Sequence, residues 1–180
     1  MYQTWPRIAK YMPLCEPLFK KYSRDKKVLE IGCNCGLYGL EMLKYIDYYI
    51  GVDKSAKMCS NAAKALVSEQ KKNWTILNMS PASWELPIFL TWPGICFFDM
   101  MTMYCYRDAD VRGFEDSILP CIGTAIIVMK EYKRPPGRLY NSYGYHKSAV
   151  VVERLATRGM RLVEDIYANK HKNRAMVFKR

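Results

Sequence analysis

The feature that most constrains this chain is a glycine-bearing turn between a strand-like run and a helix-like run. The largely apolar run Val28–Ile31 leads into Gly32–Gly36, after which apolar residues return at helical spacing. Glycines at such a turn permit positive φ angles and let a ligand approach the main chain closely. The next strand-like run, Tyr48–Asp53, ends in an acidic residue about 20 residues after the turn. The pattern predicts a β-α-β unit of a parallel sheet that binds a nucleoside-like ligand.

The rest of the chain continues the alternation of strands and helices. The predicted strands are Trp74–Met79, Gly94–Met101, Thr124–Met129, Arg161–Ala168 and Arg174–Lys179. Helices are predicted after the cap residue Ser55, over residues 110–122 and over residues 148–158. A turn is expected at Gly123, and the last two strands are expected to form a hairpin. Residues 5–22 predict one or two short helices interrupted by Pro13 and Pro17. Such alternation is typical of an α/β fold, a three-layer αβα sandwich around a mostly parallel sheet.

Length and composition favour one soluble globular domain. The 180 residues, half of them hydrophobic, predict a single domain over 1–180, with an N-terminal helical segment at 1–27 and a core at 28–180. No run of about 18 apolar residues and no secretory leader is visible, so we expect a cytoplasmic protein without a membrane partner. The seven cysteines include no pair with zinc-like spacing. We therefore expect reduced, structural cysteines and no metal site.

Three details separate the two nucleoside cofactors that such a sheet commonly binds, NAD and S-adenosylmethionine. Glu30 lies two residues before Gly32, where a carboxylate would face a cationic amino-acid group and would repel a pyrophosphate. Asn34 stands where the dinucleotide motif needs its middle glycine. The terminal hairpin is the third detail. Together they favour S-adenosylmethionine.

These residues resemble the Rossmann-like (class I) S-adenosylmethionine-dependent methyltransferases, and the match covers nearly the whole chain from Val28 onward. The family's glycine-rich motif is similar to Val28–Gly36, and its ribose-binding acid matches Asp53 in the run Ile50–Ser55. The resemblance implies a seven-stranded sheet of order 3-2-1-4-5-7-6 with an antiparallel last strand. It also implies a methyltransferase (EC 2.1.1.-) that releases S-adenosylhomocysteine.

The resemblance also implies a set of cofactor residues. Glu30 would face the methionine amino group and Asp53 would hold the ribose. The acidic residue that often contacts adenine after the third strand is missing here, so Met79 and Ser80 are the candidates for that contact. The complete candidate set is Glu30, Gly32, Cys33, Asn34, Gly36, Asp53, Lys54, Met79 and Ser80. In related enzymes the early helical segment often builds a cover over the substrate.

The sequence does not identify a catalytic residue. Candidates for a general base are Lys130 at the end of the fifth strand, His146 in the following loop and Tyr104 after the fourth strand. Ribose 2′-O-methyltransferases of this fold use a Lys-Asp-Lys-Glu tetrad, for which Lys130, Asp99 and Glu164 are the nearest matches, although Asp99 comes several residues early. The Asn/Asp-Pro-Pro-aromatic signature of amino-methylating enzymes is absent after the fourth strand.

The net charge of +11 bears on the acceptor. The basic excess lies in residues 1–27, 130–147 and 161–180, whereas residues 28–129 are mildly acidic. In the related fold the three basic segments border the acceptor side, so we expect an anionic acceptor, with RNA or DNA favoured. Two alternatives stay open: a non-catalytic regulatory protein that binds S-adenosylmethionine, and a small-molecule methyltransferase.

Overall fold

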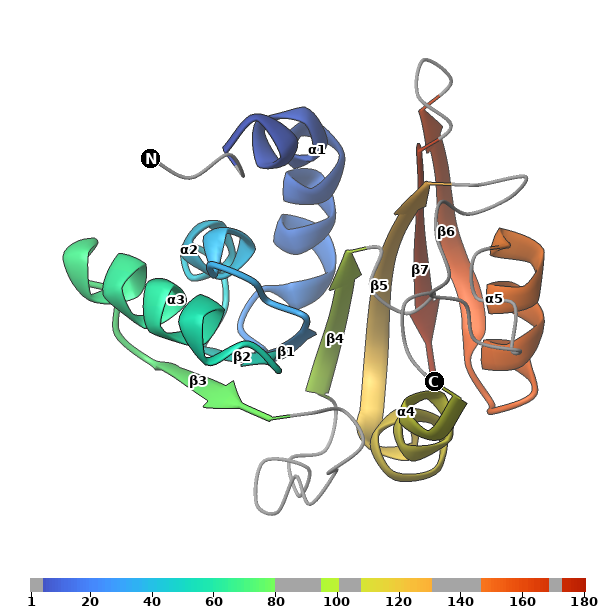
Figure 1. Cartoon of the computed structure of the whole chain (residues 1–180). Coiled ribbons are helices and arrows are strands. Elements are labelled where there is room, and N and C mark those ends of the chain that lie inside the picture. The colour runs from blue at the N-terminus through green and yellow to red at the C-terminus, as the bar shows by residue number, and fades with distance from the viewer. Residues whose placement is uncertain (1–4, 80–94, 101–107, 131–146, 169–172) are drawn as a thin grey trace. The chain divides into compact units, whose positions relative to one another are not determined.

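The computed structural model describes residues 5–79, 95–100, 108–130, 147–168 and 173–180 (Figure 1). The chain divides into two compact units, Met1–Ser80 and Pro81–Arg180. A single domain over 1–180 stays a prediction.

The first unit contains three parallel strands and the helices that flank them. Its elements are α1 (Trp5–Leu18), the π-helix η1 (Phe19–Ser23), β1 (Lys27–Ile31), α2 (Leu37–Met42), β2 (Tyr48–Asp53), α3 (Ala56–Ser68) and β3 (Trp74–Asn78). In the register, Lys27 of β1 lies opposite Tyr48 of β2. Asp53 of β2 lies opposite Asn78 of β3. The carboxyl ends of β1 and β2 therefore lie at the same edge, and the glycine turn and Asp53 meet there.

Side-chain pattern explains how these elements form. Four of the five β1 residues and four of the six β2 residues are buried, as expected for strands covered on both faces. Helix α3 begins after Ser55, whose Oγ accepts a hydrogen bond from the Met58 N–H at 3.4 Å, so the predicted cap is confirmed. Its buried face consists of Cys59, Ala62 and Leu66, at helical spacing.

The prediction that prolines interrupt the first helix is wrong. Pro13 and Pro17 both lie inside the 14-residue helix α1. Both are exposed, and their spacing of four residues puts them on one face, where water can hydrate the backbone carbonyls that lose their N–H partners. The opposite face buries Tyr11, Cys15 and Leu18. The apolar face therefore packs without a break.

The second unit contains four strands. Its elements are β4 (Ile95–Met100), α4 (Asp108–Gly113), the π-helix η4 (Phe114–Ile118), the 3-10 helix η5 (Leu119–Cys121), β5 (Ile122–Lys130), α5 (Ser148–Ala156), β6 (Arg161–Ala168) and β7 (Asn173–Lys179). The expected turn at Gly123 is wrong, since Gly123 lies within β5. There the register moves from Ile95 opposite Ile122 to Cys96 opposite Thr124, so Gly123 is the extra residue of a β-bulge.

The strand order is β3-β2-β1-β4-β5-β7-β6, as predicted. Neighbouring strands pair in parallel within β1–β2, β2–β3 and β4–β5. Strand β7 runs antiparallel to both β5 and β6, so the predicted hairpin is also confirmed. Residues 125–129 of β5 are all buried, which accounts for their unbroken apolar run.

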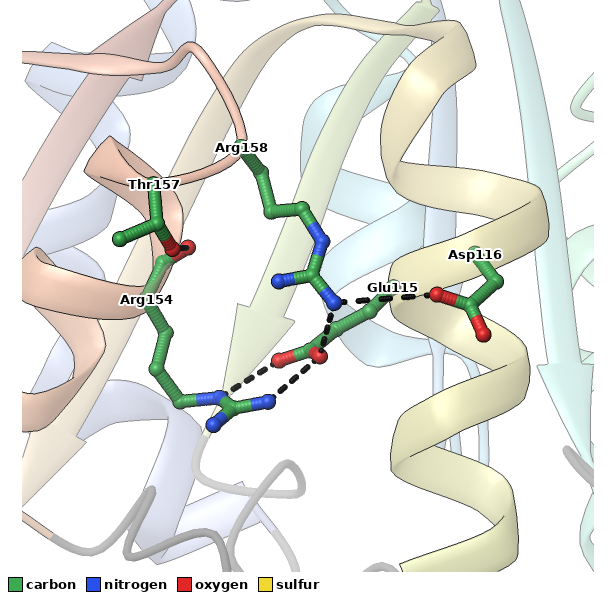
Figure 2. Close-up of polar contacts among 5 residues, drawn as sticks. All are labelled: Glu115, Asp116, Arg154, Thr157 and Arg158. Atoms are coloured by element: carbon green, nitrogen blue, oxygen red, sulfur yellow. Dashed lines mark hydrogen bonds and ion pairs between the residues drawn. The ribbon is translucent and has the colours of Figure 1, made fainter.

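A buried ion cluster joins η4 to α5 in the second unit (Figure 2). The Glu115 carboxylate is 1% exposed and accepts two hydrogen bonds from Arg154, from Nε at 2.6 Å and from Nη2 at 2.5 Å. Arg158 Nη2 donates to the same carboxylate at 2.8 Å. Asp116 lies at the edge of the cluster, 3.7 Å from Arg158 and 70% exposed. Glu115 therefore holds the last turn of α5 and the residues just after it against η4.

The structure also shows the state of the cysteines and the length of the helices. The six described cysteines are free thiols, and all except Cys121 are buried, as expected for structural cysteines. Within the described ranges, no helix has the length and apolar character needed to cross a bilayer.

Candidate functional site

The loop after β1 takes an unusual backbone path. Gly32, Asn34 and Gly36 all have positive φ angles, of 73°, 52° and 71°. The N–H groups of Gly32 and Cys33 both donate to the carbonyl of Val52, at 2.7 and 3.0 Å. Asparagine tolerates this left-handed conformation better than most residues, so Asn34 fits where related motifs have glycine. The loop is thereby held against the end of β2.

Gly36 is required for packing as well as for conformation. A Cβ atom added to it would lie 2.9 Å from the Cβ of Ala62, which belongs to α3. The absence of a side chain lets the start of α2 lie directly against α3. Gly36 therefore sets how closely α2 and α3 approach each other at the site.

Asp53 lies at the centre of the site. Its Oδ2 accepts a hydrogen bond from the N–H of Asn34 at 2.9 Å, and its Oδ1 accepts one from the N–H of Ser55 at 2.8 Å. Each carboxylate oxygen has a second lone pair. The carboxylate is therefore fixed by the loop and by the start of α3, while both oxygens retain the capacity to accept hydroxyl hydrogen bonds.

The main chain of Asp53 is fixed as well. Its carbonyl accepts hydrogen bonds from the N–H of Met79 at 3.1 Å and from the side-chain amide of Asn78 at 3.0 Å. Met79 is thus held beside Asp53. Ser80 lies outside the described residues. The side chain of Lys54 is exposed.

Glu30 is buried in β1, two residues before Gly32 of the loop. It is 2% exposed, and its Oε2 accepts a hydrogen bond from the hydroxyl of Tyr49 at 2.5 Å. Burial, followed by the nearby charge of Glu30, holds the pKa of Tyr49 well above its usual range, so the phenol stays protonated and acts as a donor. Burial, and then Glu30, also raise the pKa of the Cys33 thiol. Cys33 is therefore a neutral packing residue rather than a nucleophile.

Sequence reasoning did not identify Tyr49. The signal was present in two small residues beside it. A Cβ atom added to Gly39 would lie 2.4 Å from the Tyr49 ring, and one added to Gly51 would lie 2.9 Å from its hydroxyl. Neither glycine has a positive φ angle. Both are therefore explained by the space that Tyr49 occupies.

The second unit holds the candidates for catalysis. Lys130 is the last residue of β5 and lies opposite Asn173 of β7. Asp99 lies opposite Ile127, three residues before Lys130, which is about 10 Å along the strand. Glu164 pairs with Val177, which in turn pairs with Ile126, four residues before Lys130. The register therefore does not bring the three tetrad candidates to one level of the sheet.

Other candidates fall outside the described part of the chain. These are Tyr104, His146 and the side chains of Asp99 and Lys130. Asn173, level with Lys130, is 3% exposed, and its Oδ1 has no hydrogen-bond partner in the described ranges. Within those ranges, no group of three or more His, Cys, Asp and Glu residues could hold a metal ion.

Several basic residues lie away from the carboxyl ends of the parallel strands. Lys26 and Lys27 lie directly before and at the start of β1, about 13 Å or more along the strand direction from its glycine turn. In the second unit, Arg161 pairs with Lys179, which pairs with Thr124 near the start of β5. Lys26, Lys27, Arg161 and Lys179 therefore lie at the amino ends of β1 and β5, whereas the glycine turn and Lys130 lie at the carboxyl ends.

Comparisons with known proteins agree on the fold. No family model and no curated protein matches the sequence. Among solved structures, N-methyltransferase NodS from Bradyrhizobium japonicum WM9 is 12% identical, with 97% of this chain and 96% of that chain covered and a TM-score of 0.73. A SAM dependent methyltransferase from Aquifex aeolicus is 16% identical, with 91% and 87% covered and a TM-score of 0.67.

A third similar structure carries a ligand. Magnesium protoporphyrin IX methyltransferase (ChlM) from Synechocystis PCC 6803, with bound SAH, is 15% identical, with 99% of this chain and 82% of that chain covered and a TM-score of 0.66. At these identities the likeness concerns the fold, and it agrees with the observed strand order and antiparallel β7. The chain has the fold of the Rossmann-like (class I) S-adenosylmethionine-dependent methyltransferases.

Proposed function

We propose that the chain is an S-adenosylmethionine-dependent methyltransferase whose cofactor lies over the glycine loop of the first unit. The observation that carries the proposal is the fixed carboxylate of Asp53, hydrogen-bonded to the N–H groups of Asn34 and Ser55 at 2.9 and 2.8 Å. A carboxylate held in this way at the end of β2 is suited to accept both ribose hydroxyls. Glu30 supports the same cofactor, because its charge suits an ammonium group and opposes a pyrophosphate.

The cofactor would be held by residues of the loop and of the two strand ends. Glu30 would face the amino group, Asp53 the ribose and Met79 the adenine, with Gly32, Cys33, Asn34 and Gly36 lining the loop. When bound, S-adenosylmethionine supplies a methyl group already activated by its sulfonium. The protein then has mainly to align the acceptor with the methyl group and exclude water. S-adenosylhomocysteine is the expected product.

The acceptor is proposed to be anionic, with RNA or DNA as the first class to test. The basis is now narrower than the total charge, because several basic residues of 1–27 and 161–180 lie at the amino ends of strands. The main remaining basis is residues 130–147, which hold five basic residues and one acidic residue and follow β5. A small-molecule acceptor is the alternative, and the magnesium protoporphyrin IX methyltransferase of similar fold acts on one.

Binding and transfer should be tested separately. Calorimetry with S-adenosylmethionine, S-adenosylhomocysteine and NAD should show binding of the first two alone, and affinity for NAD alone would overturn the cofactor assignment. Transfer of a radiolabelled methyl group should then be screened over RNA, DNA, protein and small-molecule pools. Tight cofactor binding with no labelled pool would favour the non-catalytic alternative. A labelled nucleic acid should bind with steep salt dependence, and salt-insensitive binding would remove the anionic preference.

A further inference from the structure

We propose that Tyr49 is a positioning residue that holds the Glu30 carboxylate and the adjoining Cys33 of the loop in place for the amino-acid end of the cofactor. The inference rests on the proposed function. It assigns a role to a buried phenol that does not belong to the glycine motif.

The phenol and the carboxylate are in direct contact inside the first unit. Tyr49 is fully buried and Glu30 is 2% exposed, and their oxygens lie 2.5 Å apart. Because the pKa of Tyr49 is raised by burial and by Glu30, its hydroxyl remains a proton donor. A donated hydrogen bond favours the charged form of a carboxylate. The hydrogen bond from Tyr49 therefore favours the charge at Glu30 that a ligand ammonium group would need.

The sheet register explains how the contact is made. Glu30 of β1 lies opposite Gly51 of β2, and Tyr49 lies two residues before Gly51 on the same face of β2. A side chain at position 51 would meet the Tyr49 hydroxyl at 2.9 Å. The absence of that side chain lets the phenol run along β2 to Glu30. Gly39 of α2 leaves the matching space on the other side of the ring, 2.4 Å from where its Cβ would lie.

The same hydroxyl reaches the glycine loop. The Cys33 sulfur lies near the Tyr49 hydroxyl, because a Cβ on Gly51 would lie 2.9 Å from that hydroxyl and 3.0 Å from the Cys33 sulfur. Tyr49 therefore bonds to one candidate cofactor residue, Glu30, and lies beside another, Cys33. The Asp53 carboxylate has other supports, the N–H groups of Asn34 and Ser55. Loss of the Tyr49 hydroxyl should thus affect one end of the ligand and leave the ribose end unchanged.

A positioning role and a general packing role predict different results when two ligands are compared. Two ligands should be titrated against the full chain: S-adenosylhomocysteine, and 5′-methylthioadenosine, which has the same adenine, ribose and sulfur but no amino-acid group. We expect Tyr49→Phe, which retains the ring, to weaken S-adenosylhomocysteine about tenfold, the lower range for hydrogen bonds to charged groups. The affinity for 5′-methylthioadenosine should change less than about twofold, since the Asp53 carboxylate is fixed by the N–H groups of Asn34 and Ser55 and not by the hydroxyl.

Tyr48→Phe is the matched control, because it removes a neighbouring phenol hydroxyl that bonds to Thr75 at 2.8 Å on the opposite face of β2. It should leave both affinities unchanged. Glu30→Gln should reproduce the selective loss, and Tyr49→Phe should add little to it, because the hydroxyl acts through the carboxylate. Thermal unfolding of each variant shows that it is folded.

Each remaining outcome decides the matter. Equal weakening of the two ligands by Tyr49→Phe, or no weakening of either, overturns the positioning role while leaving the proposed cofactor intact. A parent protein that binds neither ligand overturns the proposed function, and the inference with it. Selective loss in Tyr49→Phe and in Glu30→Gln, with Tyr48→Phe unchanged, supports the inference.

Discussion

The N–H of Asn34 donates a hydrogen bond to the Asp53 carboxylate at 2.9 Å, joining residues that are 19 positions apart in the sequence. The bond connects the loop after β1 to the end of β2. It makes the candidate ribose-binding group part of the loop's own support. Any change to that carboxylate should therefore affect folding and cofactor binding together.

Asp53→Asn tests this coupling. One carboxylate oxygen becomes an NH₂ group that faces the backbone N–H of Asn34 or of Ser55, so that N–H loses its acceptor. We expect a loss of about 1–2 kcal/mol in the free energy of unfolding. The affinity for S-adenosylmethionine should fall at least about tenfold, because the amide cannot accept both ribose hydroxyls. Denaturant titration and calorimetry measure the two effects.

Asp47→Asn is the control for that change. Asp47 is exposed just before β2, at the strand's other end. Its substitution should alter stability by less than about 0.5 kcal/mol and leave the affinity unchanged. If Asp53→Asn bound the cofactor as tightly as the parent protein does, Asp53 would not be the ribose ligand.

Gly36→Ala tests the close contact between α2 and α3. The substitution forces alanine into the left-handed conformation of this position, at φ 71°. It also adds a Cβ atom 2.9 Å from the Cβ of Ala62. We expect a loss of about 2–4 kcal/mol in unfolding free energy, from conformational strain and overpacking together. Gly159→Ala, at φ 78° with its nearest neighbour at 3.7 Å, should show the strain alone, about 1–2 kcal/mol.

A second change separates packing from conformation at Gly36. Ala62→Gly removes the contacting Cβ at a helix-propensity cost of about 1 kcal/mol. In the Gly36→Ala background it should cost less than it does alone, or should restore stability. Strict additivity of the two changes in denaturant unfolding would show that the Cβ contact is not the cause.

The sequence predicted the strands, the helices and the glycine turn with Asp53 for physical reasons, whereas the strand order was implied by the resemblance to the methyltransferase family. Buried strands and amphipathic helices have distinct periods, and the glycine turn with Asp53 is a local pattern that few other structures produce. Ser55 was recognisable as a cap because the residue type and the following helical face agree. These features depend on residues close in the sequence, or on a spacing that one β-α-β unit sets.

The errors and omissions depend on tertiary contacts. Pro13 and Pro17 remain inside α1 because both lie on its exposed face, and a proline alone does not show which face is exposed. Gly123 forms a bulge because β4 and β5 change register beside it, which involves a strand more than 20 residues earlier. The role of Tyr49 depends on the space left beside it by Gly39 and Gly51, which the sequence alone does not show.

Stability should fall with acidity through the pair of Asp165 and Arg174. Arg174 donates to both carboxylate oxygens, at 2.8 and 2.5 Å, and these hydrogen bonds lower the pKa of Asp165. Because the folded-state pKa is the lower one, the contribution is complete above the unfolded pKa, about 3.9, and disappears as the pH falls through the folded pKa. With the carboxylate 35% exposed, we expect less than about 1 kcal/mol.

The measurement is the unfolding free energy of Asp165→Asn and of the parent protein between pH 7 and pH 3. The difference between them should be constant down to about pH 4 and then shrink. Glu153→Gln, at an exposed position of α5, serves as the charge-matched control. A difference that grew toward low pH would contradict the assigned direction.

The buried Glu115 cluster in Figure 2 should be the most sensitive ionic contact among the described residues of the second unit. Arg154→Met removes both hydrogen bonds of the bidentate pair and leaves the carboxylate, 1% exposed, with Arg158. Breaking one side of a buried pair leaves a charge insufficiently compensated, and we expect a loss of about 3 kcal/mol. Asp116→Asn, at a 70% exposed position of the same cluster, should cost less than about 0.5 kcal/mol.

Removing the charge on both sides should be less harmful than removing one. In the double variant Glu115→Leu with Arg154→Met, no carboxylate is buried, and Arg158, 36% exposed, can turn to solvent. We expect its free energy of unfolding to exceed that of Arg154→Met alone, because the desolvation penalty of Glu115 is removed with its partner. Denaturant unfolding of the four proteins of this cycle gives the coupling energy directly. A double variant less stable than Arg154→Met would mean that Glu115 stabilises α5 through contacts other than its charge.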